Sequence, residues 1–193
     1  MCVNNADFNE GTTLNATYAS DPGSPMRLQW RIGAAGKFPT RNADGSWGEV
    51  NAVPREQTGA TTWLAIVEGQ LVSYGHTTTG AAAGTYVESP PRAIPLSMKV
   101  GDSISLKYTL YNKATGLGEA RSMTRTFVAM ETLDTKLGSF EACRIKTTET
   151  LAQGSSASTV WLAAEGPYRG QVLKVVVDGG ASHTVTSMSY SPK

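Results

Sequence analysis

The chain has 193 residues, of which 40% are hydrophobic and 17% charged, a length that fits one domain of ordinary size. Lys and Arg number 17 against 16 Asp and Glu, so no net positive field exists to attract polyanions, which argues against nucleic acid as a partner. Twenty Gly and nine Pro favour strands and turns over long helices. No run of about 20 apolar residues is present, so no membrane-spanning helix is expected.

The first residues suggest a lipoprotein. Cys2 follows Met1 directly, and a polar stretch rich in Asn and Thr continues to about Pro25. Such a beginning is what remains when a bacterial lipoprotein signal peptide is removed and a start codon is restored. The sequence therefore predicts lipid on Cys2, a flexible tether over residues 1–25, and one domain over residues 26–193. The alternative is that Cys2 is an ordinary residue near the start.

The next segments alternate strand patterns with irregular regions. Met26–Ile32 places apolar and polar side chains alternately, which predicts a strand with one buried face. Residues 33–59 lack such periodicity and predict a long loop with a short strand near residues 47–50. A hairpin is predicted over residues 62–74, and residues 76–91 predict a second long loop.

Strand patterns recur through the rest of the chain, with turn residues between them. They cover residues 103–111, 122–133, 140–150, 159–163, 171–177 and 182–190. Strands at this spacing indicate an all-β domain. The predicted fold is a single antiparallel β-sandwich or a partly open, curved β-barrel with two long loops.

Three stretches resemble a broad class of Gram-negative envelope proteins, often lipoproteins, that carry a domain of unknown function. The stretches are residues 95–103, 131–145 and 160–174. In that class a Gly-x-Phe-x-Ala segment, here residues 138–142, precedes a strand with Trp, here Trp161, and a turn ending in Val-Lys. This chain departs from the pattern because Leu173 separates Val172 from Lys174 and residues 167–169 lengthen the turn. The resemblance implies an exported β-rich domain in the periplasm or outer membrane, without assigned chemistry.

No catalytic or metal-binding motif stands out. His76 and His183 each lack a Cys, acid or second His at ligand spacing, so no metal and no cofactor are expected. No G-x-S-x-G elbow occurs, and the acids Glu141, Glu149, Glu165 and Asp178 are not paired by any motif. A hydrolase would have to assemble a Ser, His183 and an acid from separate strands.

Three aromatic residues in predicted loops are the candidate contacts for a ligand or partner. They are Trp47, Tyr86 and Tyr168. Exposed rings of this kind stack on sugars or form hot spots in protein interfaces, although each could instead fold back as a loop anchor. Cys143 is expected to be a buried, inert thiol. A Cys2–Cys143 disulfide is the alternative in an oxidising periplasm, and a lipid on Cys2 would exclude it.

The sequence thus predicts a non-enzymatic, monomeric lipoprotein held to an envelope membrane through lipid on Cys2. It would bind a protein partner or an apolar ligand in the concavity of a curved sheet. A carbohydrate-binding module that uses the three aromatic residues is the alternative, and a hydrolase is a third reading. An apolar-ligand carrier requires a hollow interior, whereas the other readings do not.

Overall fold

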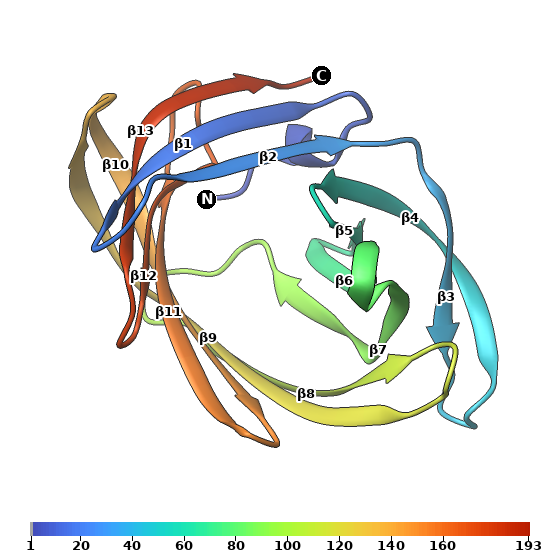
Figure 1. The fold of residues 1–193 in the computed structure, drawn as a ribbon. Coiled ribbons are helices and arrows are strands. Elements are labelled where there is room, and N and C mark those ends of the chain that lie inside the picture. Colours follow the sequence, from blue (N-terminus) through green and yellow to red (C-terminus); the bar gives the residue numbers. More distant parts are fainter. Residues whose placement is uncertain (1) are drawn as a thin grey trace.

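The computed structural model describes residues 2–193, which form thirteen strands and two short 3-10 helices (Figure 1). The elements are η1 (Asn5–Phe8), β1 (Thr13–Asp21), β2 (Met26–Ile32), β3 (Gly36–Arg41), β4 (Trp47–Gln57), β5 (Ala60–Val67), β6 (Gln70–Thr78), η2 (Gly80–Ala82), β7 (Gly84–Pro95), β8 (Ser103–Asn112), β9 (Gly118–Thr135), β10 (Gly138–Leu151), β11 (Gly154–Ala163), β12 (Val172–Val177) and β13 (Ser182–Ser191). No helix in this described part of the chain is long and apolar enough to cross a membrane.

The strands form a closed antiparallel barrel. From β4 to β13 each strand pairs with its neighbour in sequence, β13 pairs with β1, and β1 pairs with β2. Pairing of β2 with β4 closes the ring at twelve strands, and β3 pairs only with β4. The all-β prediction is confirmed. Of the two predicted architectures the barrel is the right one, but it is closed rather than partly open, because both neighbours of β4 in the ring are hydrogen-bonded to it.

Successive side chains along each strand point alternately into the barrel and out of it, so each strand has an inner and an outer face. On β1 the alternate residues Leu14, Ala16 and Tyr18 are at most 5% exposed, and they pack with Trp30 and Ile32 of β2. Their neighbours are polar residues such as Asn15 that face solvent. This cluster fills one part of the barrel with apolar side chains.

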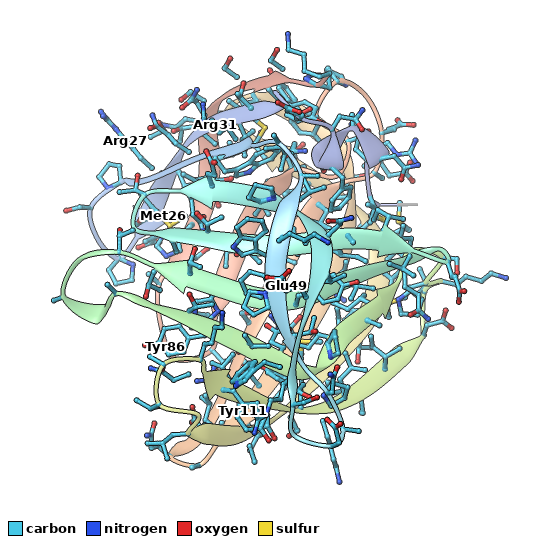
Figure 2. The ribbon with its side chains drawn as sticks, turned by 90° about the vertical axis from the view of Figure 1, so that its right-hand side faces the viewer. Met26, Arg27, Arg31, Glu49, Tyr86 and Tyr111 are labelled. Atoms are coloured by element: carbon cyan, nitrogen blue, oxygen red, sulfur yellow. A yellow bond between two sulfur atoms is a disulfide. The ribbon has the colours of Figure 1, made fainter. Side chains whose placement is uncertain are left out.

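The connections between strands fall at two ends. The β5–β6 turn, the segment of residues 96–102 between β7 and β8, and residues 2–12 lie at what we term the Cys2 end. The turns β1–β2, β8–β9 and β12–β13 lie at the opposite end. Figure 2 places this opposite end at the left, where Met26 and Tyr86 mark the starts of β2 and β7.

A hairpin of β3 and the first half of β4 crosses the outside of the barrel wall. In Figure 2 it runs across β5, β6 and β7, with Glu49 on it. Phe38 and Ala52 on the hairpin are each 1% exposed and pack with Val87 of β7, and Phe38 stacks on Trp63 of β5 at 5.2 Å. We call this hairpin the flap. It buries a second, smaller core on the outer face of the wall.

The predicted tether over residues 1–25 is wrong for residues 2–21. Thr13–Asp21 is a central barrel strand, and Cys2 and Asp7 are buried. The tether was predicted from the many polar residues of this stretch. In β1 those polar residues face outward and alternate with buried apolar ones, which is the pattern of a strand. Met1 lies outside the described residues.

The two predicted long loops are also wrong. Residues 33–59 contain β3 and β4, and residues 76–91 contain the end of β6 and the start of β7. Prolines are uncommon within paired strands, which favoured the loop prediction. In the structure four of them lie within strands: Pro39, Pro54, Pro90 and Pro91. The predicted strands after residue 103 are confirmed as β8 to β13.

Candidate functional site

The barrel interior carries a buried charge network between β7 and β10. The guanidinium of Arg92 donates to both carboxylate oxygens of Glu88, at 2.7 and 2.8 Å, and to Glu149 at 3.3 Å. It also lies 5.2 Å from the ring centre of Tyr108. The Glu88 side chain is only 3% exposed, so this ion pair is shielded from water. The network pairs a cation with two carboxylates and joins β7 to β10, two strands that are not adjacent in the sheet. It is therefore a structural cross-link between opposite parts of the wall.

Arg125 has a different environment. It lies on β9, opposite Ile104 of β8 and Thr147 of β10, and its side chain lines an interior cavity of about 60 Å³. Burial lowers its pKa, and the nearby positive charge of Arg92 lowers it further. No carboxylate among residues 2–193 forms an ion pair with it. Arg125 is therefore a desolvated cation without a counter-charge.

The interior cavity is otherwise apolar. Its walls are built by β6, β7, β9, β10 and β11 together with residues 2–3 and the segment after β7. They include Cys2, Leu71, Ile94, Leu96, Met98, Phe127, Ile145 and Leu162. Pockets for small apolar ligands usually span about 300–1,000 Å³. At about 60 Å³ the cavity has room for a few water molecules only.

A larger concavity lies on the outer face of the wall. Its volume is about 720 Å³, and it runs over β7, β8, β9 and the β10–β11 turn. Its lining includes Tyr108 and Arg121, which register places on one face of the sheet, and Lys107, Thr109, Ser122 and Thr150, which register places on the opposite face. Because Tyr108 and Met123 are buried inside, these four residues face outward. We call this concavity the outer groove.

The outer groove begins where two strands separate. β7 pairs with β8 only from Tyr86 to Ser89. From Pro90 onward β7 pairs with β6 alone, and residues 103–108 of β8 pair with β9 alone. Pro90 and Pro91 have no backbone N–H to donate, so they end the ladder. The first half of β8 thus presents a strand edge that no other strand in the described chain covers, and we call this place the wall gap.

The three predicted contact residues do not gather in one site. Trp47 begins β4 on the flap and is 36% exposed, with the Arg41 guanidinium 4.7 Å from its ring centre. Tyr86 stacks on His76 at 5.0 Å. Tyr168 lies at the Cys2 end, packs against Phe140 and donates a hydrogen bond of 3.3 Å to the carbonyl of Met188. Tyr86 and Tyr168 thus serve as packing anchors, and Trp47 alone among the three is exposed.

Cys2 is joined to Cys143 by a disulfide, with their Cα atoms 6.1 Å apart. Both residues are buried, at 7% and 0% exposed, and they pack with Phe127, Ile145 and Leu162. A sulfur in a disulfide has no free valence for the thioether that holds a lipid. The predicted lipid on Cys2 and this disulfide are therefore alternatives for the same atom.

The rest of the N-terminal segment closes the Cys2 end. Asp7 accepts hydrogen bonds from Tyr190 at 2.6 Å and from the Gln171 amide at 2.7 Å. Burial raises the pKa of Asp7, although these bonds and the nearby Arg55 oppose the shift. The Arg55 guanidinium lies over the rings of Phe8 and Trp30 at 5.7 and 5.0 Å. These contacts tie residues 2–12 to β4, β13 and the β11–β12 connection.

The two histidines occupy different settings. The Nδ1 atom of His183 lies 2.7 Å from Ser20 Oγ, because β1 and β13 pair these residues directly. No acid is hydrogen-bonded to the ring of His183 in residues 2–193. Burial lowers the pKa of His76, which stacks on Tyr86. No group of three metal-ligating side chains occurs in the part of the chain that the structure describes. No local spacing in the sequence indicates the Ser20–His183 pair, because 163 residues separate its members.

No protein-family model and no curated protein sequence matches this chain. Solved structures that are similar to it include the following three. A candidate lipoprotein from Parabacteroides distasonis ATCC 8503 has 10% identity and a TM-score of 0.44, covering 94% of this chain and 96% of that one. A candidate exported protein with a YmcC-like fold from Bacteroides fragilis NCTC 9343 has 15% identity and a TM-score of 0.41, with the same two coverages.

The third is the hypothetical lipoprotein YmcC from Escherichia coli (K12), at 14% identity and a TM-score of 0.39, covering 94% of this chain and 86% of that one. All three are described as lipoproteins or exported proteins, the class of protein that the sequence resembles. At these values the likeness carries no function over to this chain.

Proposed function

We propose that the protein is a non-enzymatic envelope protein that binds a protein partner, by taking an extended segment of that partner into the outer groove at the wall gap. The observation that carries the proposal is the uncovered edge of β8 between residues 103 and 108. An open strand edge offers a row of backbone donors and acceptors, which an extended peptide satisfies by adding a strand. Of the functions predicted from the sequence, this proposal takes up the binding of a protein partner.

The groove suits such a segment in size and chemistry. Its volume of about 720 Å³ exceeds that of the interior cavity, about 60 Å³, by more than tenfold. Its outward hydroxyls on Ser89, Thr109, Ser122 and Thr150 are polar groups beside the edge. An apolar ligand inside the barrel is the weaker reading because the walls of the interior cavity leave no room for it.

A non-enzymatic role is supported by how the charged groups are used. Glu88, Arg92 and Glu149 satisfy one another, so none is left poised for proton transfer. The Ser20–His183 contact uses Nδ1, and a serine nucleophile also needs a third group to orient the ring. A fluorophosphonate probe is expected to leave Ser20 unlabelled. Labelling that disappears in His183→Ala would contradict the non-enzymatic proposal.

Peptide binding is tested with an array of short synthetic peptides. Bound peptides are expected to share a period-two pattern, because a strand added to β8 turns alternate side chains toward the groove. N-methylation of alternate backbone amides in a bound peptide should abolish binding for one set of positions and spare the other. Equal binding after methylation of either set, or no bound peptide at all, overturns the proposal.

A pair of matched variants locates the site. Thr109→Trp fills the outer groove, whereas Thr159→Trp adds the same ring to the outer face of β11, away from both the groove and the edge of β8. The first variant is expected to weaken peptide binding by about tenfold or more, equivalent to about 1.4 kcal/mol, and the second to leave it unchanged. Equal effects of the two would place the peptide elsewhere.

Export to the envelope is part of the same proposal, and Cys2 supports it in either state. A buried disulfide persists in oxidising compartments, and a lipidated cysteine occurs on an envelope membrane. Mass spectrometry with maleimide labelling of the denatured protein from an envelope fraction separates the states. The disulfide form has no free thiol and no added mass. The lipidated form has one free thiol, that of Cys143, and the mass of the lipid.

A further inference from the structure

We propose that the interior cavity is a binding site for a small monovalent anion, such as nitrate or chloride, which the guanidinium of Arg125 holds. The cavity has a volume of about 60 Å³ and includes Arg125 in its lining. All other described residues of the lining are apolar, apart from Cys2, whose sulfur is in the disulfide. The site is separate from the outer groove, so this inference goes beyond the proposed function.

The strands on either side of Arg125 provide no counter-charge. Its register partners are Ile104 of β8 and Thr147 of β10, which share its inward face. Neither partner carries a charge. Within residues 2–193 the guanidinium of Arg125 forms no ion pair and donates no hydrogen bond. Its N–H donors are therefore available to a bound acceptor.

The buried charge network between β7 and β10 does not supply the missing charge either. Arg92 forms ion pairs with Glu88 at 2.7 Å and with Glu149 at 3.3 Å. Burial lowers the pKa of Arg125, and the positive charge of Arg92 lowers it further, whereas neither carboxylate raises it. The potential at Arg125 is therefore positive. An anion beside it is attracted by this potential, and surroundings of low dielectric strengthen the attraction.

The size and chemistry of the cavity select the class of anion. A space of about 60 Å³ has room for a few water molecules, and so for an anion of a few atoms, but not for an acyl chain. The apolar walls offer no polar group to replace the hydration shell that an anion loses on entry. A guanidinium is itself weakly hydrated. We therefore expect anions that lose water at low cost, nitrate and bromide, to bind more tightly than chloride, and fluoride to bind least.

An anion in this cavity stabilises the folded chain. The lining comes from β6, β7, β9, β10 and β11 together with residues 2–3 and the segment after β7, so the cavity exists only when the barrel has formed. A ligand that binds the folded state alone raises the folding equilibrium constant as its concentration exceeds its dissociation constant. Anion binding is therefore measurable as a gain in stability that depends on Arg125.

The test is urea unfolding of the full, disulfide-bonded chain in mixtures of sodium nitrate and sodium gluconate at constant ionic strength. Gluconate is too large for the cavity, and urea adds no anion. Arg125→Met removes the guanidinium. Arg27→Met is the matched control, because Arg27 is exposed on β2 and forms no ion pair in the described chain.

The folding equilibrium constant of wild type relative to Arg125→Met is expected to rise about threefold or more between about 10 and 300 mM nitrate. The same ratio for wild type and Arg27→Met should stay constant, because a difference between two proteins cancels the general effect of the salt on stability. An equal response of wild type and Arg125→Met to nitrate overturns the proposal.

A crystal grown in sodium bromide gives a direct readout, because bromide is located by its anomalous scattering. Bromide is expected beside the guanidinium of Arg125 in wild type and absent from the same place in Arg125→Met. If Arg125→Met does not fold, the wild-type crystal decides alone. Bromide that occupies only surface positions of wild type overturns the proposal.

Discussion

Asp7 is the residue whose surroundings differ most from what its sequence context suggests. It was expected in a solvated tether, yet it is 6% exposed and accepts bonds from Tyr190 and Gln171. Burial raises its pKa above the ordinary value of 3.8. An acid of this kind stabilises the fold most when it is neutral, because the unfolded chain ionises it more readily.

The change Asp7→Asn tests this effect. Asn keeps an oxygen that accepts both hydrogen bonds and removes the ionisation. The free energy of unfolding of wild type relative to the variant should be highest below the ordinary pKa of Asp7 and should fall as the pH rises through the raised one. Urea unfolding at a series of pH values from acid to neutral measures the difference. A difference that grows with pH would mean that attraction to Arg55 outweighs the cost of burial.

Substitution by Met is expected to change the free energy of unfolding in opposite directions at the two interior arginines. Arg92→Met leaves the buried carboxylate of Glu88 without its partner and should lower the free energy of unfolding by about 3 kcal/mol. Arg125→Met removes a desolvated cation that has no counter-charge and should raise it by about 1 kcal/mol. Denaturant unfolding at neutral pH compares them. A destabilising Arg125→Met would imply that the guanidinium is paired in solution.

At the scale of elements, the sequence predicts strands in which apolar and polar residues alternate. It does not predict strands that form only by pairing or packing with distant segments. β2 and β8 to β13 were predictable because one face of each strand is apolar and turn residues bound them. β3 and β4 were not. Pro39 and Pro54 suggested a loop, and Phe38 is buried only because the flap folds back onto Val87 of β7. Pro90 and Pro91 lie in the second predicted loop, whereas the structure places them in β7 at the point where its pairing with β8 ends.

The contact between β6 and β7 depends on Gly75. Its φ is +138°, and a Cβ there would lie 2.0 Å from the carbonyl oxygen of Tyr86, a backbone atom that cannot rotate away. Gly75→Ala should therefore lower the free energy of unfolding by about 3 kcal/mol or more. Gly59→Ala is the control, because its φ is +79° but nothing lies within 4 Å of the added atom. It should cost about 1 kcal/mol. Thermal or urea unfolding ranks the two, and an equal loss would count against the close approach.

At the scale of the whole molecule, the candidate site was less predictable than the fold. The uncovered edge of β8 and the outer groove each depend on residues from several strands, so no local spacing in the sequence predicts them. Of the aromatic candidates, Trp47 is exposed, whereas Tyr86 and Tyr168 became packing anchors once their segments paired. The sequence alone leaves a lipid on Cys2 and a Cys2–Cys143 disulfide as alternatives, and the structure contains the disulfide.

The Cys2–Cys143 disulfide links residues 141 positions apart and so encloses most of the chain. Such a cross-link restricts the unfolded state, and a loop of this length is expected to add about 3–5 kcal/mol to the free energy of unfolding. The free energy of unfolding of the oxidised protein, measured in urea, should therefore exceed that of Cys2→Ala by this amount. Reduced wild type should match Cys2→Ala, because both retain the same barrel strands and lack the cross-link. If oxidised and reduced protein unfold at the same urea concentration, residues 2–12 are held by Asp7 and its partners without help from the disulfide.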